Sequence, residues 1–268
     1  MEKKYEPKEQ SPQPQTDQIF SKLPKEAQEK LKVIKEKLEK FQKNILTKFD
    51  KYIMGISLLP PPKTDKPEEE KDKIHALVLV DDSDSEKMTK LELRDKLTTI
   101  INQSANEIDK NIVVQTLIIS ELWQGCYDGK YDFLQIISLS APIYDNGMLQ
   151  AIKIAEIHKT MVLKKFEKYI ISYVLAGSLV QGRATKTSDI DVWIVIDDTD
   201  VKKMTRAELK DKLRAIIIGM GIEAGEMTGI RNKLNIQVYI LTDFWDSLRE
   251  ANPIIFTLLR DGVPFYDR

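Results

Sequence analysis

Short runs of alternating polar and apolar residues are separated by longer amphipathic stretches, and this arrangement occurs twice along the chain. Ile190–Ile196 (IDVWIVI) alternates apolar with other residues and is rich in β-branched types, which predicts a half-buried strand. Ile74–Val80 (IHALVLV) predicts a second one. Long amphipathic helices are expected over residues 25–52 and 149–171. Such alternation of helices and strands predicts an α/β fold, with a small mixed sheet packed against helices in each half.

The two halves are related by an internal repeat with a period of about 120 residues, which is too long for a solenoid. KFDKYI returns as KFEKYI, and IHALVLVDDSDSEKMTKLELRDKL returns as IDVWIVIDDTDVKKMTRAELKDKL. A capping box then opens a helix in each copy, at Thr89 and again at Thr205. The matched segments 113–123 and 235–245 are each expected to be a strand ending at a tryptophan, followed by a short helical segment.

The repeat divides the chain into three predicted parts. Residues 1–24 are rich in Lys, Glu, Gln and Pro and lack apolar periodicity, so a disordered arm is expected there. Residues 25–146 and 147–268 are predicted to be two tandem domains of the same plan.

The polar residues of the second copy suggest chemistry. Asp189 and Asp191 are two residues apart at the start of a strand, so both side chains point to the same face. Neighbouring carboxylates repel each other, and a divalent cation such as Mg²⁺ relieves that repulsion while sharing its remaining positions with substrate phosphates. Before the pair stands Gly177-Ser178, and small, hydroxylic and cationic residues lie between them: Gly182, Arg183, Lys186 and Ser188.

The run GSLVQGRATKTSDIDV (residues 177–192) resembles the nucleotidyltransferase superfamily related to DNA polymerase beta, in its minimal form. That family carries Gly-Ser, a gap, and Asp-x-Asp in a strand. The resemblance implies Mg²⁺-dependent transfer of a nucleoside monophosphate from a nucleoside triphosphate, with ATP the expected donor, to an acceptor hydroxyl. It implies metal binding at Asp189 and Asp191, and contacts to the phosphates from Gly177, Ser178, Arg183, Lys186 and Ser188. The acceptor stays open among RNA, protein and a small molecule.

The resemblance fails at one position, because the family usually places a third carboxylate on the later strand. Here that strand reads LNIQVYIL, and Gln237 takes the matching place. Glutamine can ligate a metal weakly but cannot act as a general base. Asp243 near the end of the strand, or Glu223 or Glu226 in what is expected to be the preceding loop, could stand in. The alternative is therefore a nucleotide-binding or regulatory protein with little turnover.

The first copy has lost the motif. Pro60-Pro61 stand where the second copy has Gly177-Ser178, Lys73 stands for Asp189, and His75 stands for Asp191. Proline has no N–H to offer a phosphate, and lysine carries the wrong charge for a metal site. The first copy is therefore expected to be degenerate. Two aromatic residues of the second copy, Trp193 and Tyr239, either pack beside the site or stack on a base.

Composition narrows the remaining choices. The formal net charge is −1, which argues against a general nucleic-acid coat without excluding a local basic groove. The single cysteine cannot form an internal disulfide, and two histidines with one cysteine disfavour a zinc site. Since there is no long apolar run, a cytoplasmic protein without membrane contact is expected. A protein partner that the enzyme modifies is a further possibility.

Overall fold

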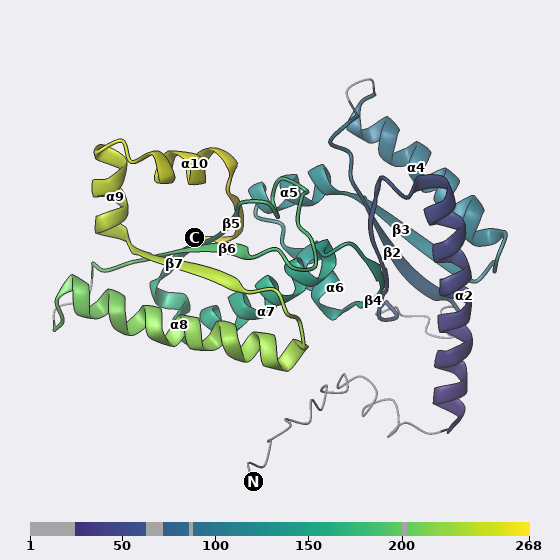
Figure 1. The fold of residues 1–268 in the computed structure, drawn as a ribbon, viewed down its shortest axis with the longest axis horizontal. Helices are drawn as coiled ribbons and strands as arrows, with labels where there is room; N and C mark the ends of the chain where they lie inside the picture. The colour runs from purple at the N-terminus through teal and green to yellow at the C-terminus, as the bar shows by residue number, and fades with distance from the viewer. Residues whose placement is uncertain (1–24, 63–71, 86–87, 200–202) are drawn as a thin grey trace, which may run out of the picture.

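The computed structural model describes residues 25–62, 72–85, 88–199 and 203–268 (Figure 1). The predicted arm, residues 1–24, lies outside the described residues. Within the described ranges, no helix combines the length and apolarity needed to cross a membrane.

Two four-stranded mixed sheets form the framework, and the predicted fold class is confirmed. The first sheet has the order β3-β2-β1-β4 and the second has the order β7-β6-β5-β8. In each, the two central strands are antiparallel, and one outer strand joins parallel while the other joins antiparallel. The strands are β1 (Ile53–Leu58), β2 (Ile74–Val80), β3 (Ile112–Ile118), β4 (Ala141–Asp145), β5 (Ile170–Ala176), β6 (Ile190–Ile196), β7 (Leu234–Ile240) and β8 (Val263–Asp267).

The pairing register is the same in both sheets. His75 of β2 lies opposite Val113 of β3, and Asp191 of β6 lies opposite Asn235 of β7. His75 of the first unit, which contains the first sheet, therefore occupies the position that Asp191 occupies in the second unit, which contains the second sheet. The shared ancestry of the two units, and a boundary between residues 146 and 147, stay predictions.

Helices flank both sheets: α2 (Lys25–Phe49), α4 (Lys90–Asn106), α5 (Ile119–Tyr127), α6 (Asp132–Leu139), α7 (Met148–Phe166), α8 (Arg206–Thr228), α9 (Leu241–Arg249) and α10 (Pro253–Asp261), with a 3-10 turn over Glu167–Tyr169. Both predicted capping boxes are confirmed. The Thr205 hydroxyl accepts from the Glu208 N–H, and a Glu208 oxygen accepts from the Thr205 N–H at 3.0 Å. Thr89 and Glu92 make the same pair of contacts at the start of α4.

The prediction of strands that run to the two tryptophans is wrong. β3 ends at Ile118 and β7 ends at Ile240, so Trp123 lies in α5 and Trp245 lies in α9. The buried residues of α5 explain the change, since Ile119, Leu122, Trp123 and Cys126 recur at helical spacing. A short apolar run of this kind fits either structure, and the tertiary contacts decide between them.

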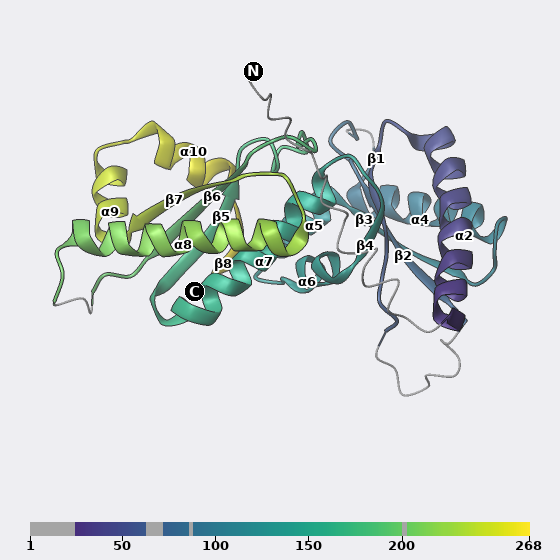
Figure 2. The same ribbon diagram turned by 60° about the horizontal axis from the view of Figure 1, so that its bottom comes forward.

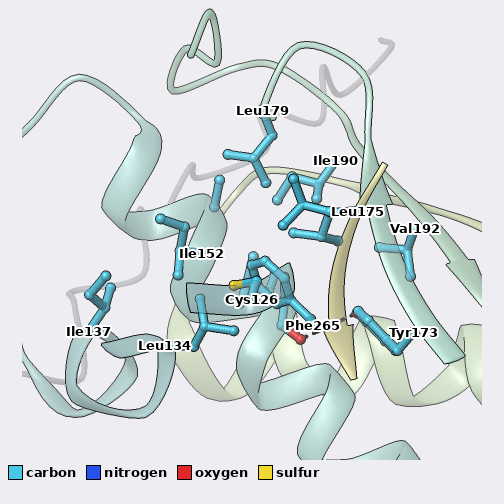
Figure 3. Close-up of a cluster of buried hydrophobic side chains, with 14 of the residues drawn as sticks. Cys126, Leu134, Ile137, Ile152, Tyr173, Leu175, Leu179, Ile190, Val192 and Phe265 are labelled. Carbon is cyan, nitrogen blue, oxygen red and sulfur yellow. Dashed lines mark hydrogen bonds between the residues drawn. The ribbon is translucent and has the colours of Figure 1, made fainter. Parts of the chain in front are cut away.

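The second unit packs its helical side onto the first unit. Helices α2 and α4 cover one face of the first sheet, while α5, α6 and α7 lie between the two sheets (Figures 1 and 2). Figure 3 shows Leu134 and Ile137 of α6 facing Ile152 of α7, with Leu175 and Phe265 of the second sheet close by. One core therefore joins the units. This core fills one face of the first sheet, whereas the corresponding face of the second sheet lies open.

A buried histidine within this core predicts a pH-dependent stability. His158 is fully buried; its Nε2 donates to the Ile217 carbonyl at 3.0 Å, and its Nδ1 accepts from the Tyr173 hydroxyl at 2.9 Å. Burial lowers the pKa of His158 to about 4, outweighing the bond to Ile217. The unfolded chain takes up a proton below pH of about 6.5, and the folded chain does so only near pH 4. Stability should therefore fall by about 3 kcal/mol as the pH drops through that window.

The control is His158→Phe, which removes the titrating group. The free energy of unfolding is measured in urea at pH 7 and near pH 4.5 for both proteins. The wild type should lose more stability than the variant between the two pH values. An equal loss in both proteins would show that His158 is not the cause.

Candidate functional site

The turn after β5 is built around a glycine that no residue with a side chain can replace. Gly177 has a φ of 74°, a left-handed conformation that side chains disfavour. A Cβ on Gly177 would also collide with the Oδ2 of Asp191. The turn that carries Ser178 therefore closes directly on the Asp191 carboxylate, and the structure brings together two halves of the predicted motif.

The Asp191 carboxylate is the first member of a row of polar side chains on the open face of the sheet. Its Oδ1 accepts from the Nδ2 of Asn235 at 2.8 Å, and the Oδ1 of Asn235 accepts from the Nε2 of Gln237 at 3.4 Å. Asn235 lies directly opposite Asp191, whereas Gln237 lies opposite Trp193, two residues farther along the strands. Sequence reasoning missed Asn235, because only the register between β6 and β7 identifies it. The role of Gln237 as a metal ligand stays a prediction.

Asp189 lies at the edge of the site, where β6 begins. It is exposed and immediately precedes β6, so strand alternation directs it to the same side as Asp191. The two carboxylates thus lie at the same end of the sheet as the Gly177 turn.

The candidate third carboxylates lie elsewhere. The prediction of a loop around Glu223 and Glu226 is wrong, since both are exposed residues of α8. The helix continues because Gly221 lets it pack closely on Ile236 of β7. Asp243 lies in the first turn of α9, where its carboxylate is 3.8 Å from the Lys210 ammonium. Among the described residues, no group of three or more His, Cys, Asp or Glu side chains is placed to hold a metal.

The segment between the turn and β6 is held by its own hydrogen bonds. The Ser188 hydroxyl accepts from the Thr185 N–H at 2.9 Å and contacts the Thr185 hydroxyl at the same distance. Buried Asn232 donates from Nδ2 to the carbonyls of Thr185 and Ser188, at 3.2 and 2.8 Å. Ser188 and Asn232 therefore shape this loop; Asn232 had no signal in the sequence pattern.

The two predicted cations of the loop lie in different surroundings. Lys186 is near the buried carboxylate of Asp145, which accepts three N–H groups at the start of α7. Burial raises the pKa of Asp145, and those hydrogen bonds and the charge of Lys186 oppose the rise. The Arg183 guanidinium contacts the Gln181 side chain, and the backbone N–H of Arg183 donates to the Ser178 carbonyl at 2.9 Å.

The first unit packs against the loop that joins the Gly177 turn to β6. Leu179 and Ala184 are buried in the core that joins the units, and Gly182 lies against Met54 of β1. The first unit, which lacks the motif, thus packs against the loop that follows the Gly177 turn and supports its position.

Beyond Asp191 the open face of the sheet forms a hollow of about 560 Å³, bounded on one side by α10. Asp191, Asn235 and Gln237 supply its polar groups, while Trp193 and Tyr239 supply aromatic surface. The remaining lining residues are Ala176, Pro253, Ile254, Thr257 and Leu258.

The family profile described as "Nucleotidyltransferase domain" matches residues 155–231. The second unit carries a nucleotidyltransferase domain. The match to this nucleotidyltransferase domain includes Gly177, Asp189 and Asp191 and ends before β7, so it does not cover Asn235 or Gln237.

Other comparisons add little. No curated protein matches the chain significantly. Among solved structures, the chain is similar to a provisionally assigned nucleotidyltransferase from Sulfolobus solfataricus, at 18% identity and a TM-score of 0.30, over 47% of this chain and 90% of the other. At this TM-score the similarity does not establish a shared fold.

The hydrogen bonds from Asn232 to the loop before β6 give a testable prediction for the nucleotidyltransferase domain. Asn232→Leu keeps the approximate size of the side chain but removes both hydrogen bonds to the loop and leaves two carbonyls without this donor. The expected cost is about 1–3 kcal/mol in the free energy of unfolding. Asn235→Leu, at an exposed position, is the matched control and should cost much less. Equal losses in urea unfolding would contradict the anchoring role.

Proposed function

We propose that the second unit transfers a nucleoside monophosphate from a Mg²⁺-bound nucleoside triphosphate, with ATP the expected donor, to an acceptor hydroxyl. The observation that carries the proposal is the closure of the Gly177 turn on the Asp191 carboxylate. A phosphate-binding turn and a metal-binding carboxylate must adjoin for such a reaction, because the metal and the turn bind the same phosphate chain.

The residues present fit one Mg²⁺ ion. Asp189 and Asp191 offer carboxylate oxygens, and the carboxamide oxygen of Gln237, or of Asn235 beside Asp191, would supply a third ligand. Mg²⁺ favours oxygen ligands and usually binds through one or two carboxylates plus water and phosphate. When bound, the ion would neutralise charge on the triphosphate.

The chain's own residues would position the reactants. Gly177 allows the backbone to approach the phosphates, and the Ser178 hydroxyl donates to their oxygens. The acceptor hydroxyl releases its proton to water as its oxygen bonds to the α-phosphorus, the bond between the α-phosphorus and the oxygen that bridges to the β-phosphate breaks, and pyrophosphate leaves. Arg183 and Lys186 would add positive charge at this end, and Ser188 would keep the loop closed around it.

A second candidate function is nucleotide binding with little turnover. It is favoured by Asn235 and Gln237, since neither carboxamide can accept the proton of the acceptor hydroxyl. The acceptor is open among RNA, protein and a small molecule, and a modified protein partner in the cytoplasm stays a proposal.

The test combines binding and turnover. Each labelled triphosphate is incubated with Mg²⁺ and the full chain, first alone and then with extracted RNA, protein or small molecules. Binding and pyrophosphate release are both measured. Asp189→Asn and Asp191→Asn should each weaken Mg²⁺-dependent nucleotide binding at least tenfold, because a neutral amide replaces a ligand of the cation.

Asp243→Asn is the matched control, since that carboxylate pairs with Lys210 away from the Gly177 turn. Release of pyrophosphate by the wild type supports transfer, whereas tight binding without release supports the second candidate. Unchanged nucleotide affinity in both aspartate variants would refute the metal assignment.

A further inference from the structure

The open face of the second sheet differs from its counterpart in the first at two matched positions. By register, Leu77 of β2 corresponds to Trp193 of β6, and Leu117 of β3 corresponds to Tyr239 of β7. Both leucines are 1% exposed in the core that joins the units. Trp193 and Tyr239 instead line the hollow. Where the face is closed the chain has aliphatic side chains, and where it is open the chain has aromatic ones.

The two aromatic rings already form a stack. The centroids of Trp193 and Tyr239 are 5.3 Å apart, and the ring planes are inclined by 18°. Phe244 contacts Tyr239 edge-on, and the Lys210 ammonium lies 5.4 Å from the Tyr239 centroid. These contacts hold Tyr239 in place, so a flat ring that joined the stack would meet a surface with little rotational freedom to lose.

Polar groups lie beside the stack. Gln237 is the direct strand neighbour of Trp193 and, like Asn235, lines the hollow. A carboxamide offers both a donor and an acceptor, which is what the edge of a nucleobase requires. Across from the sheet, Ile254 and Leu258 of α10 supply apolar surface to the same hollow.

The hollow begins at the proposed phosphate site. Asp191 and Ala176, which adjoins Gly177, line one end, and Trp193 follows Asp191 by one side chain on the same face. Successive side chains on one face of a strand are about 7 Å apart. A ligand with phosphates at Asp191 can therefore extend along the sheet to the aromatic pair.

We propose that this hollow binds a planar heteroaromatic ring of the nucleobase class, stacked on the Trp193–Tyr239 pair with its polar edge against Gln237. The proposal rests on the proposed function, since it places the ring relative to the phosphates. The ring belongs either to the donor nucleotide or to the acceptor, and the experiment separates the two.

The variants Trp193→Leu and Tyr239→Leu introduce the residues of the first unit. Affinity is measured for a non-hydrolysable Mg²⁺·nucleoside triphosphate analogue and for Mg²⁺·tripolyphosphate, which has no ring. Free nucleosides are then titrated into protein saturated with the analogue. Trp245→Leu, at a 54% exposed tryptophan of α9, is the matched control.

If the ring is that of the donor, Trp193→Leu should weaken the analogue about tenfold or more while tripolyphosphate affinity is unchanged. If the ring is that of the acceptor, the analogue is unaffected and nucleoside binding to the saturated protein is weakened instead. Gln237→Leu should reduce the preference among bases in either case. Trp245→Leu should change none of these affinities.

The proposal is overturned if Trp193→Leu and Tyr239→Leu leave both the analogue and the nucleosides bound as tightly as in the wild type. Asp191→Asn separates this failure from failure of the proposed function. In that variant tripolyphosphate should bind at least tenfold more weakly, and an unchanged value refutes the phosphate site whatever the aromatic variants do.

Discussion

Replacement of Gly177 by Ala should abolish Mg²⁺-dependent nucleotide binding while the chain still folds. The added methyl group would collide with the Asp191 Oδ2, so either the turn or the carboxylate must move. A backbone φ of 74° adds a cost of about 1 kcal/mol for any residue with a side chain. Since the proposed site needs the turn and the carboxylate side by side, a shift of either should weaken nucleotide binding at least a hundredfold.

Gly129→Ala separates the collision from the backbone cost. Gly129 has a φ of 70°, and no heavy atom would lie within 4 Å of its added Cβ. Gly129→Ala should therefore lose about 1 kcal/mol in urea unfolding and Gly177→Ala at least as much, and only Gly177→Ala should lose affinity in titration calorimetry with a Mg²⁺·nucleotide analogue. Wild-type affinity in Gly177→Ala would rule out a phosphate site at this turn.

Trp123→Ala should destabilise the protein by about 3–5 kcal/mol, the usual cost of removing a large aromatic side chain from a core. Trp123 is 8% exposed, and its ring lies 6.3 Å from that of Phe265 in the second unit. The variant would open a cavity between α5 and the second sheet. Because one core joins the units, we expect the loss in the free energy of unfolding of the whole chain.

Trp245→Ala provides the matched comparison. Trp245 holds the same place in α9 that Trp123 holds in α5, but it is 54% exposed. Truncation there should cost less than about 1 kcal/mol. The comparison uses equilibrium unfolding of both variants under one condition. Similar losses would mean that the core between the units does not provide the stability we assign to it.

The exposed residues of α9 and α10 extend the same contrast. Phe256 and Leu259 of α10 are 52% and 58% exposed, whereas Leu134 and Ile137 of α6 are 0% and 1% exposed. The helices follow their strands in the same order in both units, and in the described part of the chain α5 and α6 pack against elements of the other unit. The sequence of a repeat therefore does not reveal which copy buries its apolar side chains.

The sequence by itself determined the local features of this protein. Alternating β-branched residues placed the central strands, and a threonine followed by a glutamate at the right spacing placed the starts of α4 and α8. It also placed Asp189 and Asp191 on one face. Each of these depends on residues within a few positions of one another, where backbone geometry alone sets the outcome.

Only the tertiary structure decided features that depend on distant residues. It placed Asn235, and not Gln237, opposite Asp191, because the register between parallel strands is fixed by the packing of the whole sheet. It extended α8 through Glu223, since a close helix–strand contact at Gly221 outweighs the weak helix propensity of glycine. Finally, it filled one face of the first sheet and left the matching face of the second sheet open, because the helices between the two sheets pack on that face of the first sheet and on the opposite face of the second.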